Sequence, residues 1–254
     1  MARKRLAHTR LAKSPNFDRA YRESPARYWT ELARLDYRLP EHTQRLARAL
    51  IGSFEPRFWL DVGCSWGINQ ILVTRDVTLD ELIAHYTGPD AGEGAWPGRL
   101  ARWEHAEQVR RLGIDVYPEP IDYCRRLGLL HGSTVCDLNA AEWSGRARAL
   151  IARADLITAT GVWSYLDVTV WARLVELTPR AVLFGLAVDD TSVDLDEIAG
   201  TLPDTHQLIE AGPLLPQRLS KDGDVMARPV IIGPHELAPG LAVTVDAVAS
   251  ERTP

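Results

Sequence analysis

Acidic residues follow three apolar segments of this chain in succession. They are Asp61, Asp115 and Asp137. Each preceding segment has the length and the apolar or β-branched content of a strand. Because parallel strands end along one edge of a sheet, we expect the three carboxylates to line a single crevice. Ionised carboxylates only accept hydrogen bonds, so the crevice suits a ligand with a ribose diol, an ammonium or an exocyclic amine.

A glycine turn directly follows Asp61. Residues 58–73 read as a buried strand, a turn with Gly63 and Gly67, and a helix that starts near Ile68. Glycine permits a tight turn with close backbone approach to a bound group. Taken alone, the pattern also suits a nicotinamide or flavin enzyme.

Further strands and helical segments alternate along the chain, which predicts a parallel, doubly wound α/β sheet. In the tail, residues 229–232 and 241–245 both have strand character, and either could complete the sheet at its edge. The expected strands of the main body are 58–61, 111–116, 133–136, 154–161 and 180–186.

The N-terminal 53 residues have a different pattern. Apolar residues between Ser24 and Ser53 recur at helical spacing, which predicts two amphipathic helices, the second beginning at Pro40. Residues 1–13 are basic and are expected to form a solvated tail. We therefore divide the chain into a tail and helical cap (1–53) and a main domain (54–254).

Size and composition narrow the function. With 254 residues the chain can form one large α/β domain with additions. Its net charge of -5 offers no broad basic field for nucleic acid. No long apolar run predicts a membrane span or a secretory signal. Cys64, Cys124 and Cys136 have no metal-ligand spacing and no even count for disulfides, so we expect a cytoplasmic protein without a metal.

Between Phe54 and Leu186 the chain resembles the class I S-adenosylmethionine-dependent methyltransferases. The segment Leu60 to Gly67 is similar to the first motif of that family, and Asp155 to Tyr165 looks like its fourth. The resemblance implies a mostly parallel, seven-stranded, Rossmann-like sheet with an N-terminal helical cap. By the same resemblance, Asp115 binds the ribose hydroxyls and Asp137 with Leu138 lies beside the adenine. The cofactor-binding residues implied are Asp61, Gly63, Cys64, Ser65, Gly67, Asp115, Val116, Asp137, Leu138, Thr160 and Gly161.

The chain departs from the family pattern in two places. Ser65 occupies the middle of the glycine loop, where it avoids backbone strain only at negative φ, and the bulky Trp66 precedes Gly67. The interval from Asp61 to Asp115 is also long, since the second acidic residue usually follows the glycines by about 20 residues. We expect an insertion at about 74–107 that covers the cofactor or the substrate.

The sequence names no certain catalytic base. Methyl transfer from a sulfonium depends mainly on in-line positioning of the acceptor, to which proton removal adds a further factor. For each histidine a surface or structural role is the alternative. The base candidates are His131, Tyr165, Asp189, His206 and His235.

Aromatic side chains could wall an acceptor site near these strand ends. Tyr21, Tyr28, Trp29 and Tyr37 could close over the site as a lid, although ordinary helix packing explains them equally well. The predicted substrate-binding residues are Tyr28, Trp66, Trp163 and Tyr165.

The leading hypothesis is methyl transfer from S-adenosylmethionine to a small metabolite, at oxygen or nitrogen, with S-adenosylhomocysteine as product. The alternatives are a catalytically silent S-adenosylmethionine-binding sensor or scaffold and a nicotinamide-dependent oxidoreductase. Acceptor groups in nucleic acid or protein are disfavoured, because Thr160-Gly161-Val162-Trp163 stands where an Asn-Pro-Pro-Tyr-like motif would lie. The oligomeric state stays open, with a homodimer as one option.

Overall fold

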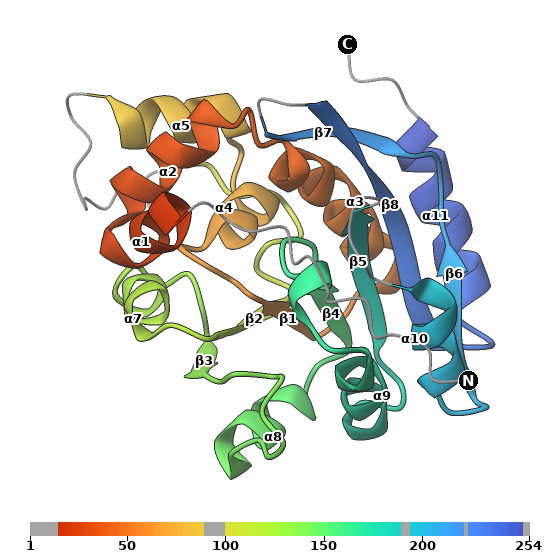
Figure 1. Ribbon diagram of the computed structural model, residues 1–254. Helices are drawn as coiled ribbons and strands as arrows, with labels where there is room; N and C mark the ends of the chain where they lie inside the picture. Colours follow the sequence, from red (N-terminus) through yellow and green to blue (C-terminus); the bar gives the residue numbers. More distant parts are fainter. Residues whose placement is uncertain (1–14, 89–99, 189–193, 221–222, 251–254) are drawn as a thin grey trace, which may run out of the picture.

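The computed structural model describes residues 15–88, 100–188, 194–220 and 223–250, which form one sheet with helices on both faces (Figure 1). The strands are β1 (Phe58–Val62), β2 (Arg110–Asp115), β3 (Gly132–Val135), β4 (Leu156–Ala159), β5 (Val182–Val188), β6 (His206–Glu210), β7 (Leu215–Ser220) and β8 (Gly223–Pro234). The helices are α1 (Pro15–Glu23), α2 (Pro25–Arg34), α3 (Leu39–Phe54), α4 (Ile68–Thr74), α5 (Leu79–Thr87), α7 (Pro118–Arg126), α8 (Gly145–Ile151), η1 (Trp163–Tyr165), α9 (Val168–Leu177), α10 (Leu195–Thr201) and α11 (Ala238–Ser250).

Seven strands form a continuous row in the order β3-β2-β1-β4-β5-β8-β6, and β7 pairs with β8 beside it. Strands β1 to β5 run parallel, whereas β8 runs antiparallel to both β5 and β6. The predicted mostly parallel, seven-stranded α/β sheet is therefore confirmed. In this arrangement the carboxyl ends of β1, β2, β3 and β4 meet at one edge.

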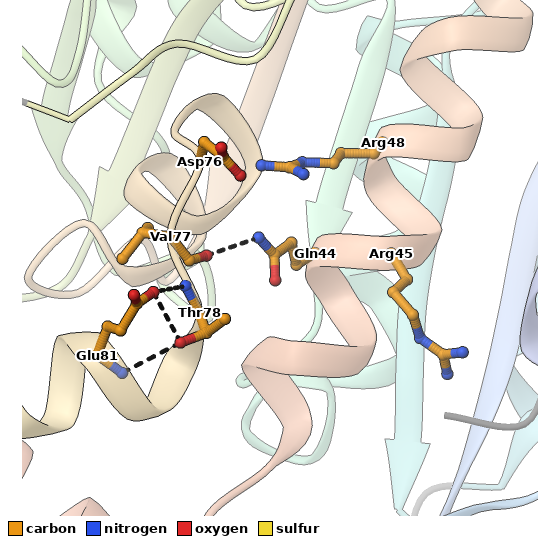
Figure 2. Close-up of a pocket in the computed structure, with 7 residues that line it drawn as sticks. All are labelled: Gln44, Arg45, Arg48, Asp76, Val77, Thr78 and Glu81. Atoms are coloured by element: carbon orange, nitrogen blue, oxygen red, sulfur yellow. Dashed lines mark hydrogen bonds between the residues drawn. The ribbon is translucent and has the colours of Figure 1, made fainter. Parts of the chain in front are cut away.

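The long interval after β1 contains an added helix, α5. Its first turn has a capping box in which Thr78 and Glu81 satisfy each other's main-chain N–H groups (Figure 2). An antiparallel bridge between Arg75 and Arg102 joins the two ends of the excursion. Part of the predicted insertion, 89–99, lies outside the described residues, so its role as a cover stays a prediction.

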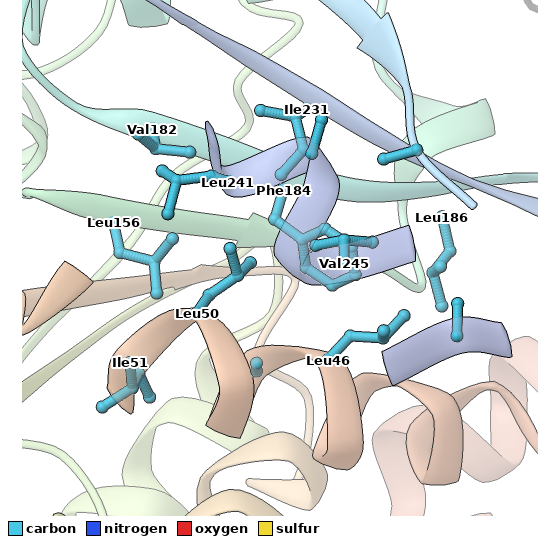
Figure 3. Packing of buried hydrophobic residues seen from close by; sticks show 14 of the residues in the cluster. Leu46, Leu50, Ile51, Leu156, Val182, Phe184, Leu186, Ile231, Leu241 and Val245 are labelled. Carbon is cyan, nitrogen blue, oxygen red and sulfur yellow. The ribbon is translucent and has the colours of Figure 1, made fainter. Parts of the chain in front are cut away.

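Two hydrophobic layers bury the sheet. Every residue of β5 is buried, as expected of a strand that is covered on both faces. On one face, Leu50 of α3 and Val245 of α11 pack beside Phe184 of β5 (Figure 3). Helices α8, α9 and α10 cover the other face. Each large apolar side chain buried in this way contributes about 1.5–3 kcal/mol.

The tail confirms one predicted strand and overturns the other. Residues 229–232 lie in β8, but 241–245 belong to helix α11. Leu241, Val245 and Ala249 recur at four-residue steps and are buried, whereas Val243 is 69% exposed. The β-branched residues suggested a strand, and docking of α11 against α3 favours the helix instead.

Both predicted N-terminal helices are present as α2 and α3, with Pro40 in the first turn of α3. A further helix, α1, precedes them; the expected tail at 1–13 lies outside the described residues. Only Ser24 separates α1 from α2, and its hydroxyl accepts the Arg27 N–H at 3.2 Å as an N-cap. Aromatic residues of these helices form a third hydrophobic cluster with Trp66 of the glycine loop.

Candidate functional site

The glycine loop connects β1 to α4 through three residues with positive φ. Gly63 has φ +68° and Gly67 has φ +79°, and Ser65 lies between them at +51°. Ser65 therefore does not take the negative φ at which it would avoid backbone strain. The left-handed conformation costs a residue with a Cβ roughly 1–2 kcal/mol, so the loop keeps its shape against strain at its centre.

Close packing explains the first glycine of the loop. A Cβ on Gly63 would lie 2.1 Å from Cγ1 of Val162, in the segment after β4. The N–H groups of Gly63 and Cys64 both donate to the carbonyl of Ile114 on β2. Gly63 thus brings the loop against two neighbouring strand ends, and Cys64 is buried behind it.

Asp61, at the end of β1, is fully buried beside this loop. Its Oδ1 accepts hydrogen bonds from Thr158 Oγ1 at 2.7 Å and from Asn69 Nδ2 at 3.1 Å. Its Oδ2 has no hydrogen-bond partner within the part of the chain that the structure describes. Burial raises the pKa of the Asp61 carboxyl to about 6. The hydrogen bonds to Asp61 favour its charged form and act in the opposite direction, but burial has the larger effect.

Asp115, at the end of β2, is just as deeply buried, with 2% of its surface exposed, but both of its oxygens accept hydrogen bonds. Oδ2 accepts the Ser65 N–H at 2.9 Å and the Tyr21 hydroxyl at 2.7 Å. Oδ1 accepts the Tyr117 N–H at 3.0 Å. The structure thus brings Asp61, Asp115 and the glycine loop together, as the strand ends predicted.

The third acidic position lies farther out. Asp137 is exposed, and its Oδ1 accepts the Asn139 N–H at 2.9 Å, so it also caps a turn. The neighbouring Leu138 is buried, whereas Val116, after β2, is 49% exposed. These residues follow β2 and β3, at the same edge of the sheet as the glycine loop.

The residues after β4 face the N-terminal helices. Thr160 Oγ1 accepts a hydrogen bond from Asn69 at 3.3 Å, which links it to Asp61 through one side chain. A Cβ on Gly161 would lie 3.4 Å from the hydroxyl of Tyr37. Tyr28 and Tyr37 both lie near Tyr165. Burial raises the pKa of the Tyr28 and Tyr37 hydroxyls. Three neutral or partly buried phenols therefore gather above this strand end.

Trp163 and Trp66, which were predicted to wall an acceptor site, are buried among other side chains of the protein. Trp163 is buried, stacks on Trp171 at 3.9 Å between ring centroids, and fills the space above Gly185 of β5. Trp66 is 4% exposed, and its Nε1 donates to the Tyr21 carbonyl at 2.8 Å. Both side chains pack within hydrophobic clusters of the protein.

The histidine candidates lie at the opposite edge of the sheet. His131 precedes β3, and His206 is the first residue of β6. His235 follows the antiparallel β8 and contacts the Asp204 carbonyl. None of these positions is at the carboxyl ends of the parallel strands, so the structure contradicts their candidacy as bases. Asp189 lies outside the described residues, and Tyr165 is the candidate beside the site.

The contacts of three residues at the site were not predicted from the sequence. Thr158 and Asn69 hold Asp61, and Tyr21 contacts Asp115, although Tyr21 was considered only as part of a lid. The position of Asn69 in the first turn after Gly67 was an available signal. Nothing in the sequence pairs Tyr21 with Asp115, 94 residues away.

A polar pocket of about 450 Å³ lies away from the glycine loop, between α3 and the start of α5 (Figure 2). Gln44 and Arg48 on its wall donate to main-chain carbonyls, including those of Leu72 and Val77. None of its lining residues belongs to the glycine loop. We therefore assign these side chains to holding α3 against the excursion.

Within the described ranges, no cluster of three or more His, Cys, Asp or Glu side chains could hold a metal. In the same residues, no helix combines the length and apolar character needed to cross a membrane.

The strand order, the antiparallel β8 and the glycine loop after β1 together define the fold of the class I S-adenosylmethionine-dependent methyltransferases. No protein-family model matches the chain, and a search of curated proteins finds no match.

Solved structures supply the comparison. The plantazolicin methyltransferase BpumL in complex with SAH is 11% identical, with a TM-score of 0.50 over 87% of this chain and 95% of that one. The N-methyltransferase NodS from Bradyrhizobium japonicum WM9, also with S-adenosyl-L-homocysteine, is 17% identical, with a TM-score of 0.49 over 85% and 95%. A TehB-like SAM-dependent methyltransferase from Corynebacterium glutamicum is 16% identical, with a TM-score of 0.48 over 85% and 99%. At these identities the likeness concerns the fold.

Proposed function

We propose that this protein transfers a methyl group from S-adenosylmethionine to a small-molecule acceptor, at oxygen or nitrogen. One observation carries the proposal: two buried carboxylates, Asp61 and Asp115, flank a strained glycine loop at adjacent strand ends of a methyltransferase fold. In open α/β sheets this edge is where ligands bind.

The residues present fit that cofactor. Asp61 Oδ2, which has no hydrogen-bond partner among the described residues, offers an acceptor for an ammonium group such as that of the methionine part. Asp115 has the chemistry to hold a ribose diol, and the exposed Val116 offers an apolar surface beside it for a base.

When bound, the cofactor supplies a methyl group that is already activated by its sulfonium. The chain's own contribution is then to orient the acceptor and to exclude water. Tyr28 and Tyr37 are suited to orienting it, because phenol hydroxyls are neutral near pH 7 and can donate and accept hydrogen bonds, and burial raises the pKa of both further. For the same reason they are poor bases, and Tyr165 is the remaining base candidate beside the site.

A small acceptor is favoured by the cover that α1 and α2 form over this edge, where Tyr21 and Tyr28 are both buried. The net charge of -5 gives no electrostatic support for a nucleic-acid substrate.

Calorimetry with S-adenosylmethionine tests the proposal first. We expect binding by the full chain, loss of binding in Asp115→Ala, and no thermal shift with NAD. Incubation with methyl-labelled cofactor and a metabolite extract then identifies the acceptor. Absence of binding would refute the proposal, whereas binding without turnover of any acceptor would favour a silent sensor or scaffold.

A further inference from the structure

The hydroxyl of Tyr21 lies directly on the carboxylate that the proposed function assigns to the ribose. The Tyr21 hydroxyl donates to Asp115 Oδ2 at 2.7 Å, and the Ser65 N–H donates to the same oxygen at 2.9 Å. With the Tyr117 N–H on Oδ1, both carboxylate oxygens are engaged by this chain's own donors. Asp115 is 2% exposed as a result.

A phenol hydroxyl and a sugar hydroxyl are donors of the same kind. Burial, followed by the nearby charge of Asp115, raises the pKa of Tyr21 well above its ordinary value, so the phenol keeps its proton. Hydrogen bonds from a neutral hydroxyl to a carboxylate are among the stronger ones in proteins. Tyr21 therefore satisfies Asp115 with the type of group that a ribose diol would supply.

The rest of α1 holds Tyr21 in this position. The Trp66 indole donates to the Tyr21 carbonyl at 2.8 Å, and the Tyr21 ring packs edge-on against Tyr28 at 5.2 Å between centroids. Farther along the helix, Arg22 lies over the Tyr117 ring and pairs with Glu119 at 3.6 Å. The latter pair is exposed and contributes little. Among the contacts given for the described residues of α1, the Tyr21 hydroxyl is thus the one that reaches a strand-end carboxylate.

We propose that Tyr21 is an internal ligand of Asp115 and that the cofactor's ribose competes with it for this carboxylate. The inference rests on the proposed function and concerns the regulation of the same site. Binding requires the Tyr21 hydroxyl to leave Oδ2, so the observed affinity is lowered by the fraction of molecules in which Tyr21 is docked. The residue thereby couples the position of α1 to occupancy of the cofactor site.

The test compares the full-length wild type with Tyr21→Phe in calorimetry with S-adenosylhomocysteine. Removing the competing hydroxyl while keeping the ring should tighten binding by about 5- to 10-fold. Tyr86→Phe is the matched control, because it removes a buried hydroxyl that bonds Tyr123 in the same aromatic cluster, away from Asp115. We expect its affinity to stay within about two-fold of wild type.

A second measurement needs no variant. Amide exchange of α1 in the wild-type protein should accelerate when S-adenosylhomocysteine is added, because Tyr21 is released. Unchanged or weaker binding in Tyr21→Phe, or greater protection of α1 with ligand, overturns the competition and leaves the proposed function standing. No binding by wild type, Tyr21→Phe or Tyr86→Phe overturns both.

Discussion

Asp61 and Asp115 stand at the ends of adjacent parallel strands, equally buried, yet they have opposite hydrogen-bonding states. Asp61 keeps one oxygen without a partner among the described residues, and burial raises its pKa to about 6. Asp115 has both oxygens engaged by three donors. Burial alone therefore does not define a binding carboxylate. In the binding proposed above, Asp61 would gain a donor, whereas Asp115 would exchange the Tyr21 hydroxyl for a ribose hydroxyl.

Replacing Asp115 should have the largest effect on the affinity for the cofactor product. Asp115→Ala deletes the acceptor proposed for two ribose hydroxyls, and hydrogen bonds to charged groups are worth about 1.5–3 kcal/mol each. Calorimetry should show S-adenosylhomocysteine binding weakened by about 100-fold or more. Asp61→Ala, which removes one proposed contact, should lose less. An equal or smaller loss for Asp115→Ala would reverse the comparison.

The pH dependence of stability should separate the two carboxylates next. Because the folded pKa of Asp61 is raised to about 6 from a reference of 3.8, the unfolded chain ionises first as the pH rises. The folded state therefore loses on the order of 3 kcal/mol between about pH 4 and about pH 7. Urea unfolding should show that Asp61→Asn lacks this loss. Asp137→Asn, at an exposed position, is the control; the same slope in both variants would contradict the assignment.

Removing the hydrogen bond from Thr158 to Asp61 should have a smaller effect, on the free energy of unfolding. Thr158 donates to Asp61 and accepts from the Trp59 indole at 2.8 Å, so Thr158→Val leaves two buried groups short of a partner. We expect a loss of about 2–3 kcal/mol in the free energy of unfolding. Thr160→Val, which removes only the 3.3 Å contact with Asn69, should cost less, and the reverse order would show that Thr158 does not hold Asp61.

The smallest effect concerns the loop between the two carboxylates. Ser65→Gly relieves the positive φ and should stabilise the protein by about 0.5 kcal/mol in thermal unfolding, after the greater entropy of the unfolded glycine is subtracted. Glu55→Gly, at φ +48° at the end of α3, provides the same relief outside the site. A gain only at position 55 would show that buried contacts of Ser65 outweigh its strain.

The sequence was most informative where a pattern has one structural solution. Asp61 and Asp115 follow apolar strands in a parallel sheet, so their shared edge was predictable before any coordinates. The tail was harder, because β-branched residues at 241–245 suit a strand locally and only packing on α3 makes them helical. His206 shows a further limit: its residue type suggested a base, but strand direction places it at the far edge. The contact of Tyr21 with Asp115 depends on how α1 docks, which no local pattern encodes.

The packing of Trp163 against Gly185 limits which substitutions are possible beside the proposed acceptor site. A Cβ on Gly185 would lie 2.0 Å from the Trp163 ring, so the segment after β4 takes its path because the neighbouring strand lacks one side chain. Positions 163 and 185 are therefore sterically coupled: a larger residue on β5 requires a smaller one at the start of η1. Such an exchange would re-route the backbone beside Thr160 and Gly161. Acceptor preference could then change through a residue that never touches the acceptor.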